Sequence, residues 1–282
     1  MSKTIAGALA GIVRAATVYA KPWRRSHLRL LVSERLYERH TVETRHGPIK
    51  FVTTSARALG GPKNFFTDEP ETLAWIDGFP PDAVFWDIGA NVGQYTMYAA
   101  RCGLTVVAFE PAPNTYAALS RNLAENALRI DAYCLALSER TQLGTLYMTD
   151  THAASVFNAF ESTRDSWGRD MTIEHEQPAV GISADDFVTI FEAPWPTHIK
   201  IDVDSTEVAI LRGARRVLEA PTTRSVLIEN TAEPSVQNRA IAELMAAAGF
   251  RPTGRGSAGS DIACNVIFER TNGAMPIGSV AG

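Results

Sequence analysis

Short apolar runs alternate with amphipathic stretches along most of this chain. The runs are rich in β-branched and aromatic residues, as buried strands are, and occupy residues 84–87, 104–109, 133–137, 145–148, 198–204, 225–230 and 264–269. Helical spacing of apolar residues follows several of them, at 95–99, 114–126, 207–218 and 241–248, with Asn114 as the candidate N-cap of the second helix. Strands that alternate with helices predict an α/β fold with a doubly wound, mostly parallel sheet.

The two ends of the chain differ from this central pattern. Residues 1–40 form an apolar and basic N-terminal extension that is predicted to be partly helical, and residues 41–54 predict a β-hairpin. The predicted catalytic domain spans residues 41–270, and a Gly-rich tail at 271–282 is predicted to be flexible. Residues 151–169 have no periodicity, which predicts a substrate lid beside the sheet.

The first predicted strand runs directly into a turn at residues 87–93 that contains two glycines. Gly89 allows a sharp turn because it has no Cβ, and Gly93 allows the backbone to approach either a ligand or the sheet. Asp87, at the end of the strand, could hold an ammonium group or orient the turn. A strand, a turn and a helix in this order place a ligand at the carboxyl edge of a parallel sheet.

The second strand ends in Glu110, whose carboxylate can accept hydrogen bonds from both hydroxyls of a ribose. A dinucleotide site would need G-x-G-x-x-G to hold the pyrophosphate. Here Asn91 replaces the second glycine, and Gly93 is displaced from the third position. The pattern therefore favours a nucleotide without a pyrophosphate, such as S-adenosylmethionine. The third strand ends near Ala136, where an adenine edge could lie.

Charge and cysteine content narrow the range of partners. The chain has 282 residues and a net charge of -4, which gives no general case for nucleic acid or an anionic surface as a partner, but the charge is uneven. The first forty residues carry eight Lys and Arg against two Glu, a balance of +6, so the remainder stands at -10. Three cysteines without C-x-x-C spacing argue against a disulfide framework and a zinc site, and predict a cytoplasmic protein.

Several strand ends together resemble the FkbM family of S-adenosylmethionine-dependent methyltransferases. The resemblance rests on residues 85–93, 107–111, 200–204, 207 and 211–214, and covers roughly residues 83–230. It implies a class I methyltransferase (Rossmann-like) fold. It also implies methylation of a hydroxyl on a sugar or another hydroxylated metabolite, since most members act on hydroxyl oxygens.

The resemblance also implies roles for individual residues. The methionine end of the cofactor would be lined by Asp87, Gly89, Asn91 and Gly93. Glu110 would hold the ribose, and residues near Ala136 would flank the adenine. Lys200 and Asp202 would face the reacting centre, with Glu229 on the neighbouring strand. The family usually reads Lys-Ile-Asp-Val-Glu-Gly-x-Glu, whereas this chain has Asp204 and Ser205 in place of the Glu-Gly pair.

An alcohol acceptor needs a group that removes its proton. Asp202 is the first candidate base; its alternative role is to pair with Lys200 or to cap the next helix. His152 is the second candidate, with a loop histidine of no catalytic role as its alternative. Oxygen ligands from Asp202, Asp204 and Glu229 would suit Mg²⁺. Carboxylates at strand ends also cap helices and contact cofactors, so no metal is predicted.

Two other functions remain as alternatives. A nicotinamide-dependent oxidoreductase is disfavoured by Asn91 and by the missing third glycine. A non-catalytic nucleotide-binding protein could have kept the fold while the altered turn at Asp204 closed the acceptor site. The basic N-terminal extension could lie on the inner face of a membrane, pack on the domain, or pack on a second subunit in a homo-oligomer.

Overall fold

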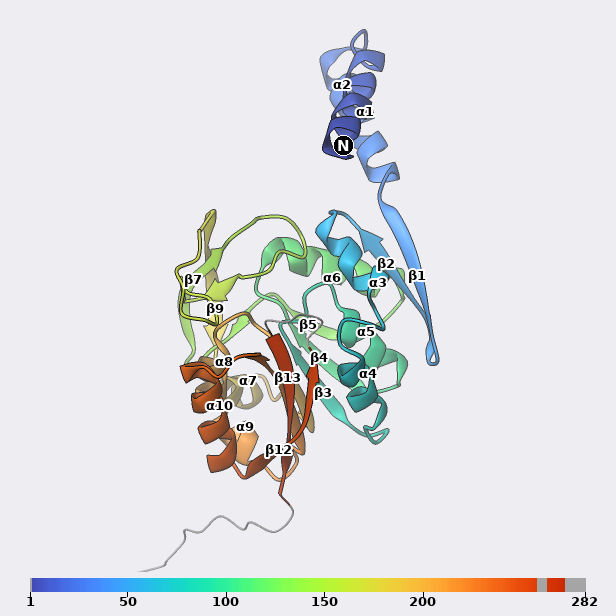
Figure 1. The fold of residues 1–282 in the computed structure, drawn as a ribbon. Helices are drawn as coiled ribbons and strands as arrows, with labels where there is room; N and C mark the ends of the chain where they lie inside the picture. The colour runs from blue at the N-terminus through green and yellow to red at the C-terminus, as the bar shows by residue number, and fades with distance from the viewer. Residues whose placement is uncertain (1, 258–262, 272–282) are drawn as a thin grey trace, which may run out of the picture.

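The computed structural model describes residues 2–257 and 263–271. A seven-stranded sheet forms its centre, in the order β12-β13-β11-β10-β3-β4-β5 (Figure 1). Its strands are β3 (Val84–Ile88), β4 (Thr105–Phe109), β5 (Asp131–Tyr133), β10 (His198–Ile201), β11 (Ser225–Thr231), β12 (Phe250–Ser257) and β13 (Ala263–Arg270). Strands β11, β10, β3, β4 and β5 run parallel, and β13 is antiparallel to both β11 and β12. The predicted doubly wound, mostly parallel sheet is confirmed.

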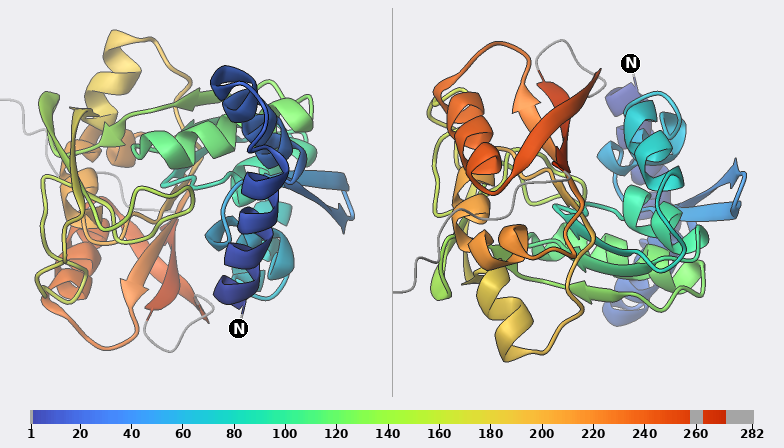
Figure 2. Two further views of the ribbon diagram at one scale, coloured as in Figure 1. Left: turned by 90° about the horizontal axis from the view of Figure 1, so that it is seen from above. Right: turned by 90° about the horizontal axis from the view of Figure 1, so that it is seen from below.

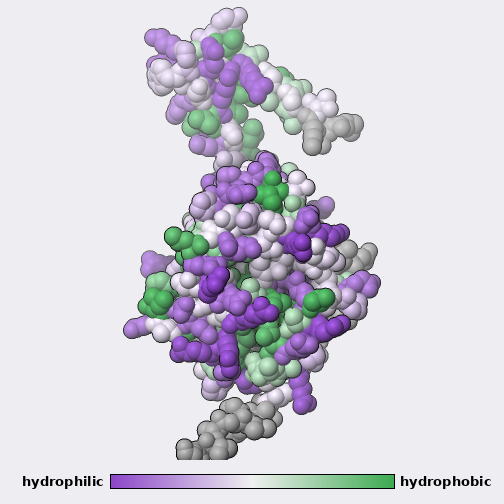
Figure 3. Space-filling model, turned by 90° about the vertical axis from the view of Figure 1, so that its left-hand side faces the viewer, coloured by the Kyte–Doolittle hydropathy of each residue, from purple (hydrophilic) through white to green (hydrophobic). Residues whose placement is uncertain are grey.

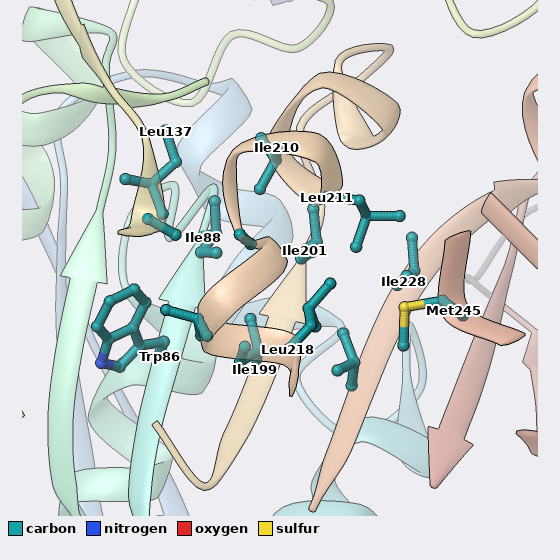
Figure 4. Close-up of a cluster of buried hydrophobic side chains, with 14 of the residues drawn as sticks. Trp86, Ile88, Leu137, Ile199, Ile201, Ile210, Leu211, Leu218, Ile228 and Met245 are labelled. Carbon is teal, nitrogen blue, oxygen red and sulfur yellow. The ribbon is translucent and has the colours of Figure 1, made fainter. Parts of the chain in front are cut away.

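Each face of the sheet carries its own apolar core, because successive side chains of a strand point to opposite faces. Trp86 and Ile88 pack on one face with the helices α7 (Ala184–Ile190), α8 (Glu207–Gly213), α9 (Arg215–Glu219) and α10 (Val236–Ala247) (Figure 4). Phe85 packs on the other face, which is covered by α4 (Pro70–Asp77), α5 (Gln94–Arg101) and α6 (Pro113–Glu125).

A second, smaller sheet extends beyond the carboxyl edge of the first. Its order is β6-β9-β7-β8, formed by β6 (Ala136–Leu137), β7 (Gln142–Met148), β8 (Ala159–Phe160) and β9 (His175–Ile182). The predicted strand at 133–137 is wrong as one element. Its first part is β5 in the main sheet, and its second part is β6, which pairs with β9. The predicted N-cap at Asn114 is also wrong, because α6 begins at Pro113 and the Asn114 amide donates to the carbonyl of Thr151 at 2.5 Å.

The N-terminal part stands away from the domain. Helices α1 (Ser2–Ala16) and α2 (Pro22–Arg35) form an N-terminal helix pair, which leads into the antiparallel strands β1 (Glu38–Thr44) and β2 (Gly47–Thr53) (Figure 1). Viewed from above, the pair lies over the half of the domain that holds β1 and β2 (Figure 2). The short helices η1 (Arg57–Leu59) and α3 (Gly60–Lys63) follow β2. Within the described residues, no helix is both long enough and apolar enough to cross a bilayer.

Candidate functional site

The carboxyl ends of three neighbouring strands meet above the centre of the sheet. Strand β3 lies between β10 and β4, and Lys200 is in register with Asp87. The residues that follow these strands therefore converge: the turn from Gly89, Glu110 after β4, and Asp202 after β10. The sheet thus brings together three segments that are up to 113 residues apart in the chain.

The two glycines of the turn allow close approach to different parts of the structure. Gly89 has φ +85°, and its amide donates to the carbonyl of Phe109 at 2.9 Å. A Cβ at this position would lie 1.8 Å from the carbonyl oxygen of Asp202, so only glycine fits. Gly93 has φ +91°, and a Cβ there would lie 2.5 Å from Leu119. Gly93 therefore allows the turn to pack against α6.

Glu110 links the turn to the end of β4 through hydrogen bonds of its carboxylate. Its carboxylate accepts hydrogen bonds from the amides of Asn91 at 3.0 Å and Ala112 at 2.9 Å. Burial raises the pKa of Glu110 to about 7, although both amide bonds oppose the shift. Next to it, the side-chain oxygen of Asn91 is buried and has no hydrogen-bond partner among the described residues. Such an orphaned acceptor is unusual in a folded protein and fits a ligand with a donor group.

A cleft lies over these strand ends. It consists of two cavities of about 280 and 400 Å³ that share the lining residues Asp68, Glu69, Gly89, Asn91, Val156 and Asp202. Glu110, Asp204 and Glu229 line the larger cavity, and Lys200 lines the smaller one. A small apolar hollow nearby includes Ala136. The cleft is thus strongly acidic at its centre and apolar at one end.

Lys200 is the cation at the base of the cleft. Its side chain is buried, and its Nζ lies 2.5 Å from Asp202 Oδ2 and 3.6 Å from Glu69 Oε2. Nζ also lies 4.7 Å from the centre of the Tyr95 ring. Burial lowers the pKa of Lys200, but Asp202, Glu69 and Asp87 together raise it above its usual range. Lys200 therefore stays charged and holds Asp202 in place.

The carboxyl groups around this pair outnumber the cation. Burial, together with the negative charge of Asp202, raises the pKa of Asp204 to about 7, of Glu207 to about 8 and of Glu229 to about 10. The positive charge of Lys200 opposes the shift for Glu229, and backbone hydrogen bonds oppose it for Asp204 and Glu207, but burial outweighs both effects. A cationic ligand such as a sulfonium or an ammonium would favour the ionised forms of these groups.

The altered turn after β10 is strained. Asp204 has φ +61° and Ser205 has φ +157°, both outside the regions that side-chain-bearing residues prefer. Asp204 Oδ2 accepts a hydrogen bond from the amide of Phe157 at 2.7 Å, which ties this turn to the irregular segment that includes Val156. The hydroxyl of Ser205 is buried without a hydrogen-bond partner among the described residues. Glycine, which the family usually has at this position, could adopt this backbone conformation without strain.

We expect Ser205→Gly to stabilise the protein by about 1–3 kcal/mol, because it removes both the backbone strain and the unpaired hydroxyl. Ser205→Ala is the matched control, since it removes the hydroxyl and keeps the Cβ. Urea denaturation of the three proteins measures the two contributions separately. If the glycine variant is no more stable than the alanine variant, the backbone conformation at Ser205 does not destabilise the protein.

Two further predicted site residues, Asp87 and His152, do not line the cleft. Asp87 is buried beneath the cleft, and its Oδ2 accepts a hydrogen bond from the hydroxyl of Thr96 at 2.5 Å. It lines neither of the two cavities and lies beside Lys200 on the neighbouring strand. His152 lies at the surface, where its Nδ1 is 2.5 Å from Asp150. The structure therefore brings Asp202 and Lys200 together and leaves His152 apart from them.

Sequence reasoning missed the acidic residues at the start of α4. Glu69 lines both cavities, and its Oε2 accepts hydrogen bonds from Thr72 at 2.7 Å and Asn265 at 2.9 Å. The only local signal was an acid at the start of a helix, which usually serves the helix dipole. Asp202, Asp204 and Glu229 do not form a metal-like cluster. Among the described residues, the group of three ligand atoms that all lie within 4.8 Å of one another belongs to His46, Asp77 and Cys102, outside the cleft.

A parallel sheet in this order, with one antiparallel strand near its edge and a nucleotide-type turn after β3, defines a class I methyltransferase fold. Residues 87–252 match the Methyltransferase FkbM domain, and the chain belongs to this family. The expected family is therefore confirmed. Residues 87–252 are therefore a domain of a methyltransferase family whose cofactor is S-adenosylmethionine.

Relatives with assigned names match only parts of the chain. A hexuronic acid methyltransferase from Haloferax volcanii is 28% identical over 57% of this chain and 62% of its own length. The 31-O-demethyl-FK506 methyltransferase of Streptomyces tacrolimicus is 38% identical over 24% of this chain and 28% of its own length. The chain thus spans less than two thirds of these relatives. The crystal structure of an FkbM methyltransferase from Methylobacillus flagellatus KT superimposes with a TM-score of 0.48 at 17% identity, covering 67% of this chain and 44% of that one.

Proposed function

We propose that the protein transfers the methyl group of S-adenosylmethionine to a hydroxyl oxygen of a sugar or another hydroxylated metabolite. The observation that carries this proposal is the placement of Asp202. Its carboxylate lines both cavities, is held by Lys200 at 2.5 Å, and still exposes 26% of its side chain. A fixed, accessible carboxylate suits the removal of a hydroxyl proton.

The residues of the larger cavity fit the cofactor. When bound, S-adenosylmethionine supplies a methyl group that is already activated on a positively charged sulfur. The acidic groups Asp204 and Glu229 offer the negative surroundings that such a charge needs. Glu110 has the acceptor oxygens for a ribose, and the orphaned oxygen of Asn91 can accept from an amino group or a hydroxyl. Gly89 and Gly93 shape the turn, Asp87 lies near the end of β3 just before it, and the small hollow of about 20 Å³ at Ala136 offers an apolar surface for one edge of the adenine.

Asp202 and Lys200 act on the acceptor in this proposal. As the acceptor oxygen forms its bond to the methyl carbon, the bond from that carbon to sulfur breaks and S-adenosylhomocysteine remains. The hydroxyl proton passes to Asp202, whose position Lys200 fixes. Alignment of the acceptor with the methyl group supplies much of the acceleration. His152 stays a prediction as the second candidate base. It would have to approach from the surface, where it pairs with Asp150.

The names of the relatives support a hydroxylated acceptor. One is named for a hexuronic acid, and another for an O-demethylated metabolite. A non-catalytic nucleotide-binding protein is the second candidate, and the strained turn at Ser205 is the observation that favours it. A nicotinamide-dependent oxidoreductase has no support from the family.

Product analysis tests the proposal. The purified protein is incubated with methyl-labelled S-adenosylmethionine and with glucuronic acid, galacturonic acid and neutral methyl glycosides. We expect label in a sugar product that is stable to mild alkali, as an ether is and a methyl ester is not. Label in an alkali-labile ester would contradict transfer to a hydroxyl. Tight binding of S-adenosylhomocysteine without turnover on any hydroxylated acceptor would favour the non-catalytic candidate.

A further inference from the structure

Helix α1 presents an apolar stripe to solvent. Ile5, Leu9 and Ile12 follow one another at intervals of four and three residues, which places them on one face of the helix. Their exposed fractions are 55%, 58% and 64%. Arg14 lies on the opposite face, nine residues after Ile5, and it is also exposed. Helix α1 is therefore amphipathic, and nothing among the described residues covers its apolar face.

Helix α2 adds exposed aromatic and basic side chains. None of its residues is buried. Trp23 and Leu30 lie seven residues apart on one face and are 66% and 63% exposed. The helix also carries the basic side chains of Arg24, Arg25, Arg29 and Arg35. Space-filling shows apolar and polar surface side by side on the N-terminal helix pair (Figure 3).

Polar contacts hold the two helices together. Arg29 Nε donates to Thr17 Oγ1 at 2.8 Å and its guanidinium to the carbonyl of Arg14 at 3.1 Å. Arg25 donates to the carbonyl of Ala20 at 3.2 Å. Thr17 is the single buried residue in the range 4–36. The large apolar side chains are thus not the core of the helix pair, and they remain available to a partner.

The charge of this region indicates the kind of partner. The first forty residues have a balance of +6. A symmetric pairing of two copies through these helices would bring two such charges together. An anionic lipid surface would instead neutralise them and accept the apolar side chains at its acyl boundary. Helix α1 is about 22 Å long, shorter than the hydrocarbon core of a bilayer, so it would lie in the interface.

We propose that the N-terminal helix pair docks the protein on an anionic membrane surface. Ile5, Leu9, Ile12 and Trp23 enter the headgroup boundary, and the Lys and Arg side chains contact lipid phosphates. Leu36, directly after α2, and Leu59, at the end of η1, line one shared hollow. The residues of η1 and α3 also form part of the cleft wall. Docking therefore holds the wall of the cleft close to the membrane.

Co-sedimentation of the full chain with vesicles tests this proposal. We expect binding to phosphatidylcholine vesicles that contain phosphatidylglycerol to be at least about tenfold stronger than binding to phosphatidylcholine alone, and to weaken as salt is raised. The variant Ile5→Ser/Leu9→Ser/Ile12→Ser should lose at least about tenfold in binding. Leu143→Ser/Val180→Ser is the matched control, because these two side chains are exposed cross-strand neighbours on the domain. The control should bind as the parent does.

Two results would overturn the proposal. One is a full chain that stays in the supernatant with the anionic vesicles. The other is light scattering that shows a dimer which the triple α1 variant converts to a monomer, since a second copy would then cover the apolar face. Binding of S-adenosylhomocysteine by every variant serves as the test of correct folding. It does not depend on the membrane, so a failure of docking is distinguishable from a failure of the proposed function.

Discussion

We expect Asp202→Asn to bind S-adenosylhomocysteine nearly as tightly as the parent protein and to transfer methyl groups roughly 10²–10⁴-fold more slowly. The asparagine amide keeps the size of the aspartate and can still accept a hydrogen bond from Lys200, but it cannot take the acceptor's proton. Calorimetry measures the binding, and initial rates with labelled S-adenosylmethionine measure the transfer.

Glu69→Gln is the matched control for this prediction. Glu69 also faces Lys200 and lines both cavities, but its Oε2 lies 3.6 Å from Nζ, whereas Asp202 Oδ2 lies 2.5 Å from it. We expect the Glu69 variant to keep a rate much closer to that of the parent. Equal losses in the two variants would mean that the charge balance around Lys200 matters and that Asp202 has no special role as the base.

The second large effect concerns folding. We expect Gly89→Ala to destabilise the protein by at least about 3 kcal/mol, because overpacking and a left-handed backbone add to each other. The added Cβ would lie 1.8 Å from the carbonyl oxygen of Asp202. Relief of this contact requires β3 and β10 to separate where the cleft begins. The midpoint of urea denaturation measures the loss.

Gly103→Ala separates the two causes of that loss. Gly103 has φ +84°, close to the +85° of Gly89, but a Cβ there would meet nothing within 4 Å. We expect this control to lower the free energy of unfolding by only about 1–2 kcal/mol, because it adds only the strain of the left-handed backbone conformation. If both variants lose the same stability, the close approach of Gly89 to Asp202 is not important for folding.

Two strands were predicted wrongly or missed from the sequence, and each error has a physical cause. The run at 133–137 looks like one strand because its residues are uniformly apolar, but only tertiary pairing decides which sheet takes each end. Strand β12 was missed because it contains Pro252 and two glycines, which favour loops in isolation. It forms because β13 offers it a partner, with a register shift between Pro252 and Gly254.

The sequence predicted those residues of the candidate site that directly follow a strand. The turn after β3 and Glu110 after β4 follow strands, and parallel strands bring their carboxyl ends to one edge, so the meeting of these groups with Asp202 follows from the pattern. Glu69 could not be predicted in the same way. It reaches the cleft because α4 packs beside β12, and because Asn265 on β13, 196 residues further along the chain, donates a hydrogen bond to it.

The sequence by itself determined the α/β alternation, the glycine turn, the acidic strand ends and the family, because each depends on residues that are close together in the chain. Tertiary structure alone decided that Gly93 packs on α6, that Asp87 lies beside Lys200 on the neighbouring strand, and that carboxyl groups with raised pKa values, among them Glu69, Asp87 and Glu229, lie around the buried Lys200. The reason is physical: burial and electrostatic coupling depend on which distant segments share a low-dielectric space, and local sequence does not contain that information.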